Sequence, residues 1–149
     1  VSTLNPAGRH ALKHFVEPLR YHDVLGMSKG GFLIGTYGME DVLVPFIQAF
    51  RALPAVVMKD VDKLGDCEVG AMRARGVVVR ECEFDGRTYF YIVNTVYEPR
   101  TVTIAFPAGT VDLVTGRSLA ADRCGRPVEF VLKPYEFRSF SSPATLHGR

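Results

Sequence analysis

The sequence lacks the features that mark several large classes of protein. Its 149 residues carry 18 basic and 16 acidic side chains, a net charge of +2, and no cationic block. Nucleic acids and anionic membranes are therefore not expected as partners. No apolar run approaches the ~18 residues that a transmembrane helix needs. The first residues combine no basic stretch with an apolar one, so we expect no signal peptide.

Cysteine is also scarce. The chain has 3 cysteines, widely spaced and without a CxxC pair, which argues against a disulfide framework and against a zinc site. Cys82 lies in an alternating stretch and is predicted to be a small core residue. His10 and His14 have a metal-binding spacing, but no HExxH context accompanies them. We predict no metal and no other cofactor, and the reducing environment of the cytoplasm is favoured.

The remaining composition is that of a globular protein. Apolar residues make up 47% of the chain and charged residues 23%, which argues against disorder. The length suits one average domain or two small ones. It is too short for a complete (β/α)₈ barrel, which needs at least about 200 residues.

The first part of the chain, residues 1–59, is predicted to form a helix, a strand and a second helix. Asn5 and Pro6 suit the start of the first helix, and Pro18 should end or bend it. The apolar run at 30–35 lies between glycines and predicts a buried strand. The second helix presents one apolar face and ends at Pro54, and Pro45 either begins or kinks it. That face carries Val42, Phe46, Ala49, Phe50 and Leu53.

Residues 60–141 show the period of two that is typical of strands, and residues 142–149 are predicted to be a loose tail. Asp85-Gly86, between two alternating runs, predicts a two-residue hairpin. We therefore predict an α+β chain, with a helix–strand–helix segment over 1–59 and an antiparallel β-sandwich over 60–149. The strands are expected at 68–73, 77–84, 87–94, 101–106, 110–114, 128–132 and 137–141.

Several of these segments resemble parts of a known enzyme class. The stretches GGFLIGTYGMED, starting at Gly30, and FIQAFRALP, starting at Phe46, resemble the closing strand and helix of a (β/α)-barrel glycoside hydrolase. The stretches TYFYIVN, VDLVTG and LKPYEFR resemble the all-β C-terminal domain that follows such barrels. The resemblance implies that residues 1–59 are the end of an α/β barrel and that the β-sandwich braces it.

The resemblance also implies an activity for the complete enzyme. That activity is the hydrolysis of glycosidic bonds by two carboxylates, with a carbohydrate as substrate. The strands expected to bear those carboxylates would lie upstream, so no catalytic residue is assigned here and this chain alone is not expected to be catalytic. The remainder of the barrel, or another chain, would pack on residues 1–59.

Five residues are candidates for contact with substrate. Thr36 and Tyr37 follow the predicted strand, on the face of a barrel where active sites lie. Tyr37 could stack on a sugar ring, or it could belong to an ordinary turn. Glu40 opens the second helix, where the helix dipole also favours a carboxylate. His22 and Asp23 are adjacent titratable residues, but no nucleophile motif accompanies them and a loop-anchoring role competes.

An alternative function is that of a non-catalytic sandwich that binds carbohydrate or a protein partner. Tyr89 and Tyr91 share one face of a predicted strand, and Phe90 lies on the other. If both tyrosines were exposed, they would form a platform for sugar rings. The competing hypothesis is that one strand face packs on the partner sheet and the other on the helical segment.

Overall fold

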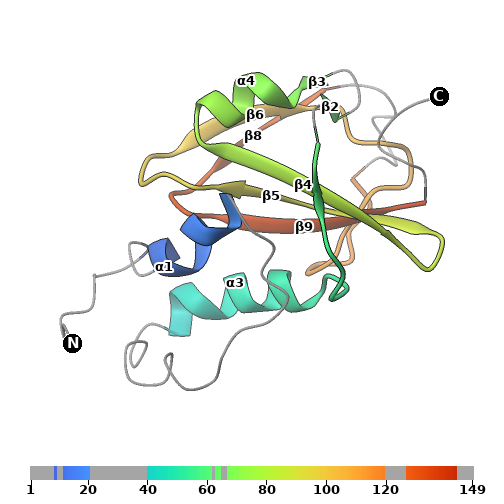
Figure 1. The fold of residues 1–149 in the computed structure, drawn as a ribbon, viewed down its shortest axis with the longest axis horizontal. Helices are drawn as coiled ribbons and strands as arrows, with labels where there is room; N and C mark the ends of the chain where they lie inside the picture. Colours follow the sequence, from blue (N-terminus) through green and yellow to red (C-terminus); the bar gives the residue numbers. More distant parts are fainter. Residues whose placement is uncertain are drawn as a thin grey trace.

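The computed structural model describes residues 9, 12–20, 40–61, 63–64, 67–119 and 127–143. These residues form three layers, and the middle layer is an antiparallel sheet (Figure 1). The sheet has five strands in the order β1-β4-β5-β9-β7. Their bounds are β1 Lys59–Asp60, β4 Val77–Phe84, β5 Arg87–Asn94, β7 Val111–Asp112 and β9 Phe137–Ser142.

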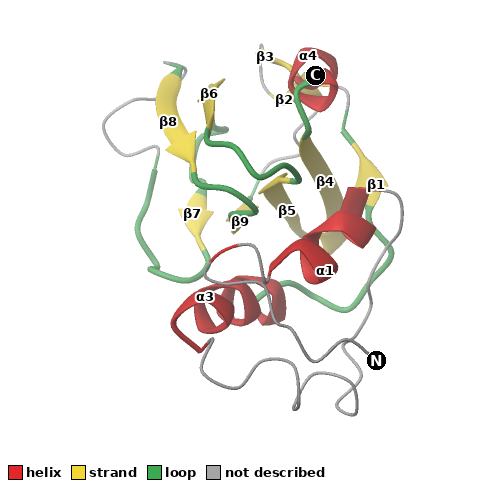
Figure 2. Cartoon of the chain, turned by 90° about the vertical axis from the view of Figure 1, so that its left-hand side faces the viewer, coloured by secondary structure: helices red, strands yellow, loops and turns green. Residues whose placement is uncertain are grey.

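The two faces of the central sheet are covered by different elements. On one face lie α1 (Lys13–Val16), the 3₁₀ helix η2 (Glu17–Arg20) and α3 (Glu40–Arg51). On the other lies the antiparallel pair β6 (Arg100–Ile104) and β8 (Val128–Leu132), together with α4 (Val69–Ala74). Figure 2 shows both coverings end-on. A short pair, β2 (Lys63–Leu64) and β3 (Cys67–Glu68), precedes α4. The predicted α+β class is confirmed.

Side chains of the central strands alternate between two cores. Phe90 and Ile92 of β5 belong to the core under β6 and β8, which we call the sheet core. Tyr91 and Val93 belong to the core under α1 and α3, which we call the helix core. The two-sided packing predicted for this strand is therefore confirmed. The hypothesis of an exposed Tyr89–Tyr91 platform is wrong, because Tyr91 is only 3% exposed and lies on a central strand that is covered on both faces.

The β4–β5 hairpin is closed as its sequence predicts. Asp85 has φ 51° and Gly86 has φ 74°, and Phe84 is paired with Arg87 across the two-residue loop. Positive φ at both loop positions is the requirement of a type I′ turn, which suits the twist of the flanking strands. The predicted strands at 77–84, 87–94 and 128–132 are confirmed at their bounds. Cys82 is buried in the helix core, as predicted.

Helix α3 passes through Pro45, so the hypothesis that the helix begins at that residue is wrong. Its inner face buries Leu43, Phe46 and Ala49 in the helix core. Gln48 and Arg51 lie on the exposed side. The apolar face drawn from the sequence is therefore the face that meets the sheet.

The strand predicted at 68–73 is wrong, because α4 occupies almost all of it. After Val69, this segment lacks the β-branched residues that favour a strand and contains Ala, Met and Arg, which favour a helix. Gly76 follows with φ 87° and ends the helical turn. A β-carbon there would lie 2.7 Å from Val96 Cγ1, so a side chain is excluded by both conformation and space.

Four other predicted elements differ from the structure in length or type, or lie outside the described residues. The first helix is described as α1 followed by η2, and Pro18 lies in the 3₁₀ turn, where it was expected to end or bend the helix. The strands predicted at 101–106 and 110–114 shorten to β6 and β7. Pro107 and the turn after Asp112 limit them. The strand predicted at 30–35 lies outside the described residues.

Candidate functional site

The predicted substrate-binding residues fall at the margin of what the structure describes. Thr36, Tyr37, His22 and Asp23 lie outside the described residues. Glu40 is the first residue of α3. The substrate site predicted around Thr36 and Tyr37 therefore stays a prediction. The described residues form a separate cleft.

Asn94, at the end of β5, organises the loops on that side of the sheet. It is fully buried, and its Nδ2 donates hydrogen bonds to the carbonyl oxygens of Glu98 (2.7 Å) and Lys133 (3.1 Å). Its Oδ1 accepts one from the Val96 amide at 3.2 Å. This side chain holds two separate loops to the end of one strand, which is a structural role.

Asp112, in β7, fixes the turn that follows it. Its Oδ1 accepts hydrogen bonds from the amides of Val114 (2.9 Å) and Thr115 (3.1 Å). Its Oδ2 accepts one from Arg138 Nη2 at 3.2 Å, so the carboxylate is also ion-paired. Both oxygens of the aspartate in the DLVTG motif are therefore engaged in holding the turn against β9.

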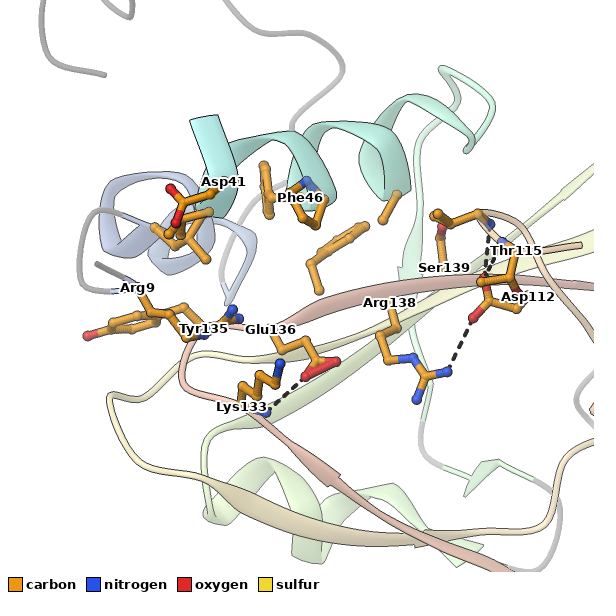
Figure 3. A pocket seen from close by; sticks show the side chains of 16 residues that line it. Arg9, Asp41, Phe46, Asp112, Thr115, Lys133, Tyr135, Glu136, Arg138 and Ser139 are labelled. Atoms are coloured by element: carbon orange, nitrogen blue, oxygen red, sulfur yellow. Dashed lines mark hydrogen bonds and ion pairs between the residues drawn. The ribbon is translucent and has the colours of Figure 1, made fainter. Parts of the chain in front are cut away.

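A cleft of about 390 Å³ opens between α3 and the β7–β9 edge of the central sheet (Figure 3). We call it the α3–β9 cleft. Its apolar lining comes from both layers and includes Val42, Pro45 and Phe46 of α3 and Phe137 of β9. Six charged residues also line it, namely Arg9, Asp41, Asp112, Lys133, Glu136 and Arg138.

The cleft exists because β9 has little cover along its outer edge. β7 pairs with β9 only at Ser141 and Phe140. The turn between β8 and β9 also lines the cleft and carries Tyr135 in the left-handed conformation, with φ 57°. Glu136 Oε1 accepts a hydrogen bond from the Lys133 amide at 3.0 Å, which closes this turn.

Two ionisable groups at the cleft have shifted pKa values. Burial lowers the pKa of Arg9, and the nearby Glu136 partly opposes that shift. Arg9 Nε donates a hydrogen bond to the Pro134 carbonyl at 2.7 Å, which ties residue 9 to the β8–β9 turn. Burial raises the pKa of Tyr135, and Glu17 and Tyr97 add to that rise.

The lining of the cleft offers hydrogen-bonding groups and apolar surface. Within the described part of the chain, no group of three histidine, cysteine or acidic residues is arranged to hold a metal. No helix among the described residues is both long and apolar enough to cross a membrane.

Sequence reasoning did not find this cleft. Its residues come from separate segments, so no local spacing joins them. In the sequence, Asp41 is only one of two adjacent carboxylates at the start of a predicted helix. The LKPYEFR stretch contains the charged residues Lys133, Glu136 and Arg138, but nothing in its sequence places them near α3.

No family model matches the chain, and no curated protein sequence matches it. Several solved structures overlap with part of it. A Bacteroides fragilis protein described as an α-galactosidase/melibiase is 20% identical, with a TM-score of 0.40 over 48% of this chain and 16% of that one. The β-galactosidase Gan42B is 20% identical, with a TM-score of 0.37 over 68% of this chain and 12% of that one.

A third solved structure of this kind is the trehalulose synthase MutB. It is 26% identical, with a TM-score of 0.35 over 61% of this chain and 15% of that one. The chain thus spans less than a fifth of each of these three proteins. Their descriptions name two galactosidases and a trehalulose synthase.

Proposed function

We propose that this chain is the C-terminal part of a glycoside hydrolase. Residues 1–59 close the catalytic barrel, and the β-rich remainder braces it. The proposal is supported by the motifs of both segments and by one structural observation, the burial of the inner face of α3 on the central sheet. The ring of Phe46 lies 5.3 Å from that of Phe137 on β9 and 5.7 Å from that of Phe15.

The bracing role follows from what each face of α3 meets. The helix is apolar on more than one face, which is typical of helices that pack on two sides. Its inner face contacts the sheet, while Val44 on the outer side is 45% exposed. The strand predicted at 30–35 and the remainder of the barrel, or another chain, would cover this outer face.

The substrate site of the complete enzyme would lie at the turn before α3. Thr36 and Tyr37 would border it, with Glu40, His22 and Asp23 nearby, because active sites of barrels lie at the carboxyl ends of the strands. The two catalytic carboxylates would come from upstream barrel strands. The substrate would be a carbohydrate.

The first test is the hydrolysis of a panel of aryl glycosides by two proteins. One is the 149-residue chain, and the other is the longer protein read from the same frame upstream of Val1. We expect turnover by the longer protein alone. Turnover by the short chain that Glu40→Gln abolishes would contradict the assignment of catalysis to upstream residues.

The second test concerns Tyr37 in the complete enzyme. Tyr37→Phe and Tyr37→Ala should lower kcat/KM roughly ten- to a hundred-fold, the effect of losing ~1–3 kcal/mol of contact with substrate. The thermal midpoint should change little. Tyr89→Phe, on β5, serves as the control with unchanged kinetics. Unchanged kinetics in both Tyr37 variants would remove this residue from the site.

A further inference from the structure

We propose that the outer edge of β8 is an interface at which two copies of this chain pair, strand against strand, to form a symmetric dimer. The proposal is independent of the proposed hydrolase, because it uses only described residues of this chain. Its support comes from the position of β8, the exposure of Val131 and the two charges that flank Val131.

β8 is the outer strand of a two-stranded pair. Among the described residues it pairs with β6 alone, and α4 and β8 lie on opposite sides of β6 (Figure 1, Figure 2). Arg75, just after α4, donates a hydrogen bond from Nη1 to the Thr101 carbonyl of β6 at 3.4 Å, so Thr101 directs its carbonyl away from β8. Val131 is paired with Thr101. Val131 therefore directs its own backbone N–H and C=O away from β6, because two paired residues of an antiparallel sheet exchange both hydrogen bonds or neither.

The outer edge of β8 has the features of a strand that accepts another strand. Its sequence, VEFVL, consists mostly of residues that favour strands, and Val131 is 57% exposed. Natural proteins often protect such an edge with proline, lysine or a bulge, but β8 contains neither proline nor lysine. A two-stranded sheet also gains stability from added strands. The pairing of two β8 strands would join two such sheets into one of four strands.

The charges beside Val131 favour a second copy of this chain as the occupant. Glu129 and Lys133 lie two residues before and two residues after Val131, and all three residues are exposed. In the described part of the chain, neither charged side chain has an ion-pair partner. If two β8 strands pair antiparallel with Val131 opposite Val131, each Glu129 lies opposite the partner's Lys133. Opposite charges at such cross-strand positions stabilise a sheet.

This register limits the assembly to two copies. The two-fold axis passes between the paired Val131 residues, so both copies use the same edge and the interface is closed. The other edge of each two-stranded pair is that of β6, which lies next to α4 (Figure 2). The paired strands are only five residues long. We therefore expect a weak dimer, with a Kd on the order of 100 µM.

The first experiment is sedimentation equilibrium of the 149-residue chain at concentrations from about 10 µM to about 1 mM, which bracket this Kd. Val131→Lys should raise the Kd for dimerisation at least about tenfold, because it places two ammonium groups opposite each other at the axis. Val57→Lys is the matched control and should leave the Kd unchanged. Val57 is more exposed than Val131, at 71%, but it precedes β1 on the far edge of the central sheet. The control separates contact at β8 from a general loss of apolar surface.

The second experiment reverses the charges and tests the register. Glu129→Lys and Lys133→Glu each place like charges opposite each other in a homodimer, so each variant alone should sediment as a monomer over this range. An equimolar mixture of the two variants should form dimers again. In the mixed dimer one copy supplies two lysines and the other supplies two glutamates, so both cross-strand pairs are of opposite charge.

Four results would overturn the proposal. They are a wild-type chain that stays monomeric at about 1 mM, wild-type affinity in Val131→Lys, a mixture of the charge variants that stays monomeric, and assemblies larger than two. A monomer whose β8 amides gain protection from exchange only in the longer protein would assign this edge to the upstream segment instead. Each variant's amide spectrum reports whether it is folded. Neither experiment measures turnover, so a failed glycosidase assay and a failed dimer are separate outcomes.

Discussion

Single polar side chains decide the shape of the loops in this protein. Asn94 and Asp112 are both buried, and each fills its hydrogen-bonding capacity with backbone groups or a cation. Removal of the Asn94 or Asp112 side chain would leave its buried hydrogen-bond partners unpaired. Each unpaired group would lower the free energy of unfolding by ~1–3 kcal/mol. The sequence shows both residues as parts of motifs. Their hydrogen-bond partners lie up to 39 residues away in the chain, so their structural role could not be predicted from local spacing.

Ser139 is the contrasting case on β9. It is 1% exposed, and its Oγ has no hydrogen-bond partner within the described part of the chain. A buried hydroxyl without a partner is unfavourable, so we expect Ser139→Ala to raise the free energy of unfolding by about 1 kcal/mol. Urea denaturation of the variant and the wild-type chain measures this difference.

Ser141 is the matched control for that prediction, two residues along the same strand. Its Oγ accepts a hydrogen bond from Arg87 Nη2 at 3.2 Å. Ser141→Ala should therefore lower the free energy of unfolding by about 1 kcal/mol. If Ser139→Ala lowered the free energy of unfolding by about 1 kcal/mol as well, the Ser139 hydroxyl would have a hydrogen-bond partner, which contradicts the prediction.

Tyr135 should make the stability of the fold depend on alkaline pH. Burial raises the pKa of its phenol in the folded chain, while in the unfolded chain it ionises near pH 10. As the pH rises past the unfolded value, the unfolded state releases its proton first. The free energy of unfolding then falls until the pH passes the folded pKa.

The measurement for Tyr135 is a series of urea denaturations between about pH 8 and pH 11. Tyr135→Phe should show a shallower fall than the wild-type chain, and the difference between the two proteins should be constant near pH 8. Parallel curves over the whole range would contradict the assignment to Tyr135.

At the scale of the elements, the sequence predicts those strands that show alternating apolar residues or end at a recognisable turn. β4, β5 and β8 have the predicted bounds because the alternation that predicts each strand lies within it, and the Asp85-Gly86 turn marks where β4 ends and β5 begins. α4 is too short for a helical pattern to show in the sequence, although its Ala, Met and Arg residues favour a helix. The α3–β9 cleft could not be predicted at all, since its walls meet only through tertiary packing.

The inner face of α3 gives the sharpest prediction at this scale. Phe46 is 3% exposed and touches rings from α1, α3 and β9, namely Phe15, Phe50 and Phe137. Phe46→Ala should lower the free energy of unfolding by about 3–5 kcal/mol, because it leaves a cavity among these rings. Gln48→Ala, on the exposed side, should change it by less than about 0.5 kcal/mol. Denaturant titration compares the two, and equal losses would mean that the buried face is wrongly assigned.

At the scale of the whole molecule, the central sheet joins two cores that face in opposite directions. The helix core contains residues from both predicted segments, among them Leu43 and Phe46 before residue 60 and Val93 and Phe137 after it. The boundary between residues 59 and 60 stays a prediction. The packing of the helix core predicts that α3 folds and unfolds together with the sheet that it covers.

Native-state hydrogen exchange tests this coupling most directly, since it reads the opening free energy of each element in one experiment. The amides of α3 after Pro45 and those of β5 should exchange with the same free energy, within about 1 kcal/mol, and Phe137→Ala should lower both equally. Gln48→Ala should leave both unchanged. Exchange of α3 at a free energy several kcal/mol below that of β5, insensitive to Phe137→Ala, would contradict the account of a helix braced by the sheet.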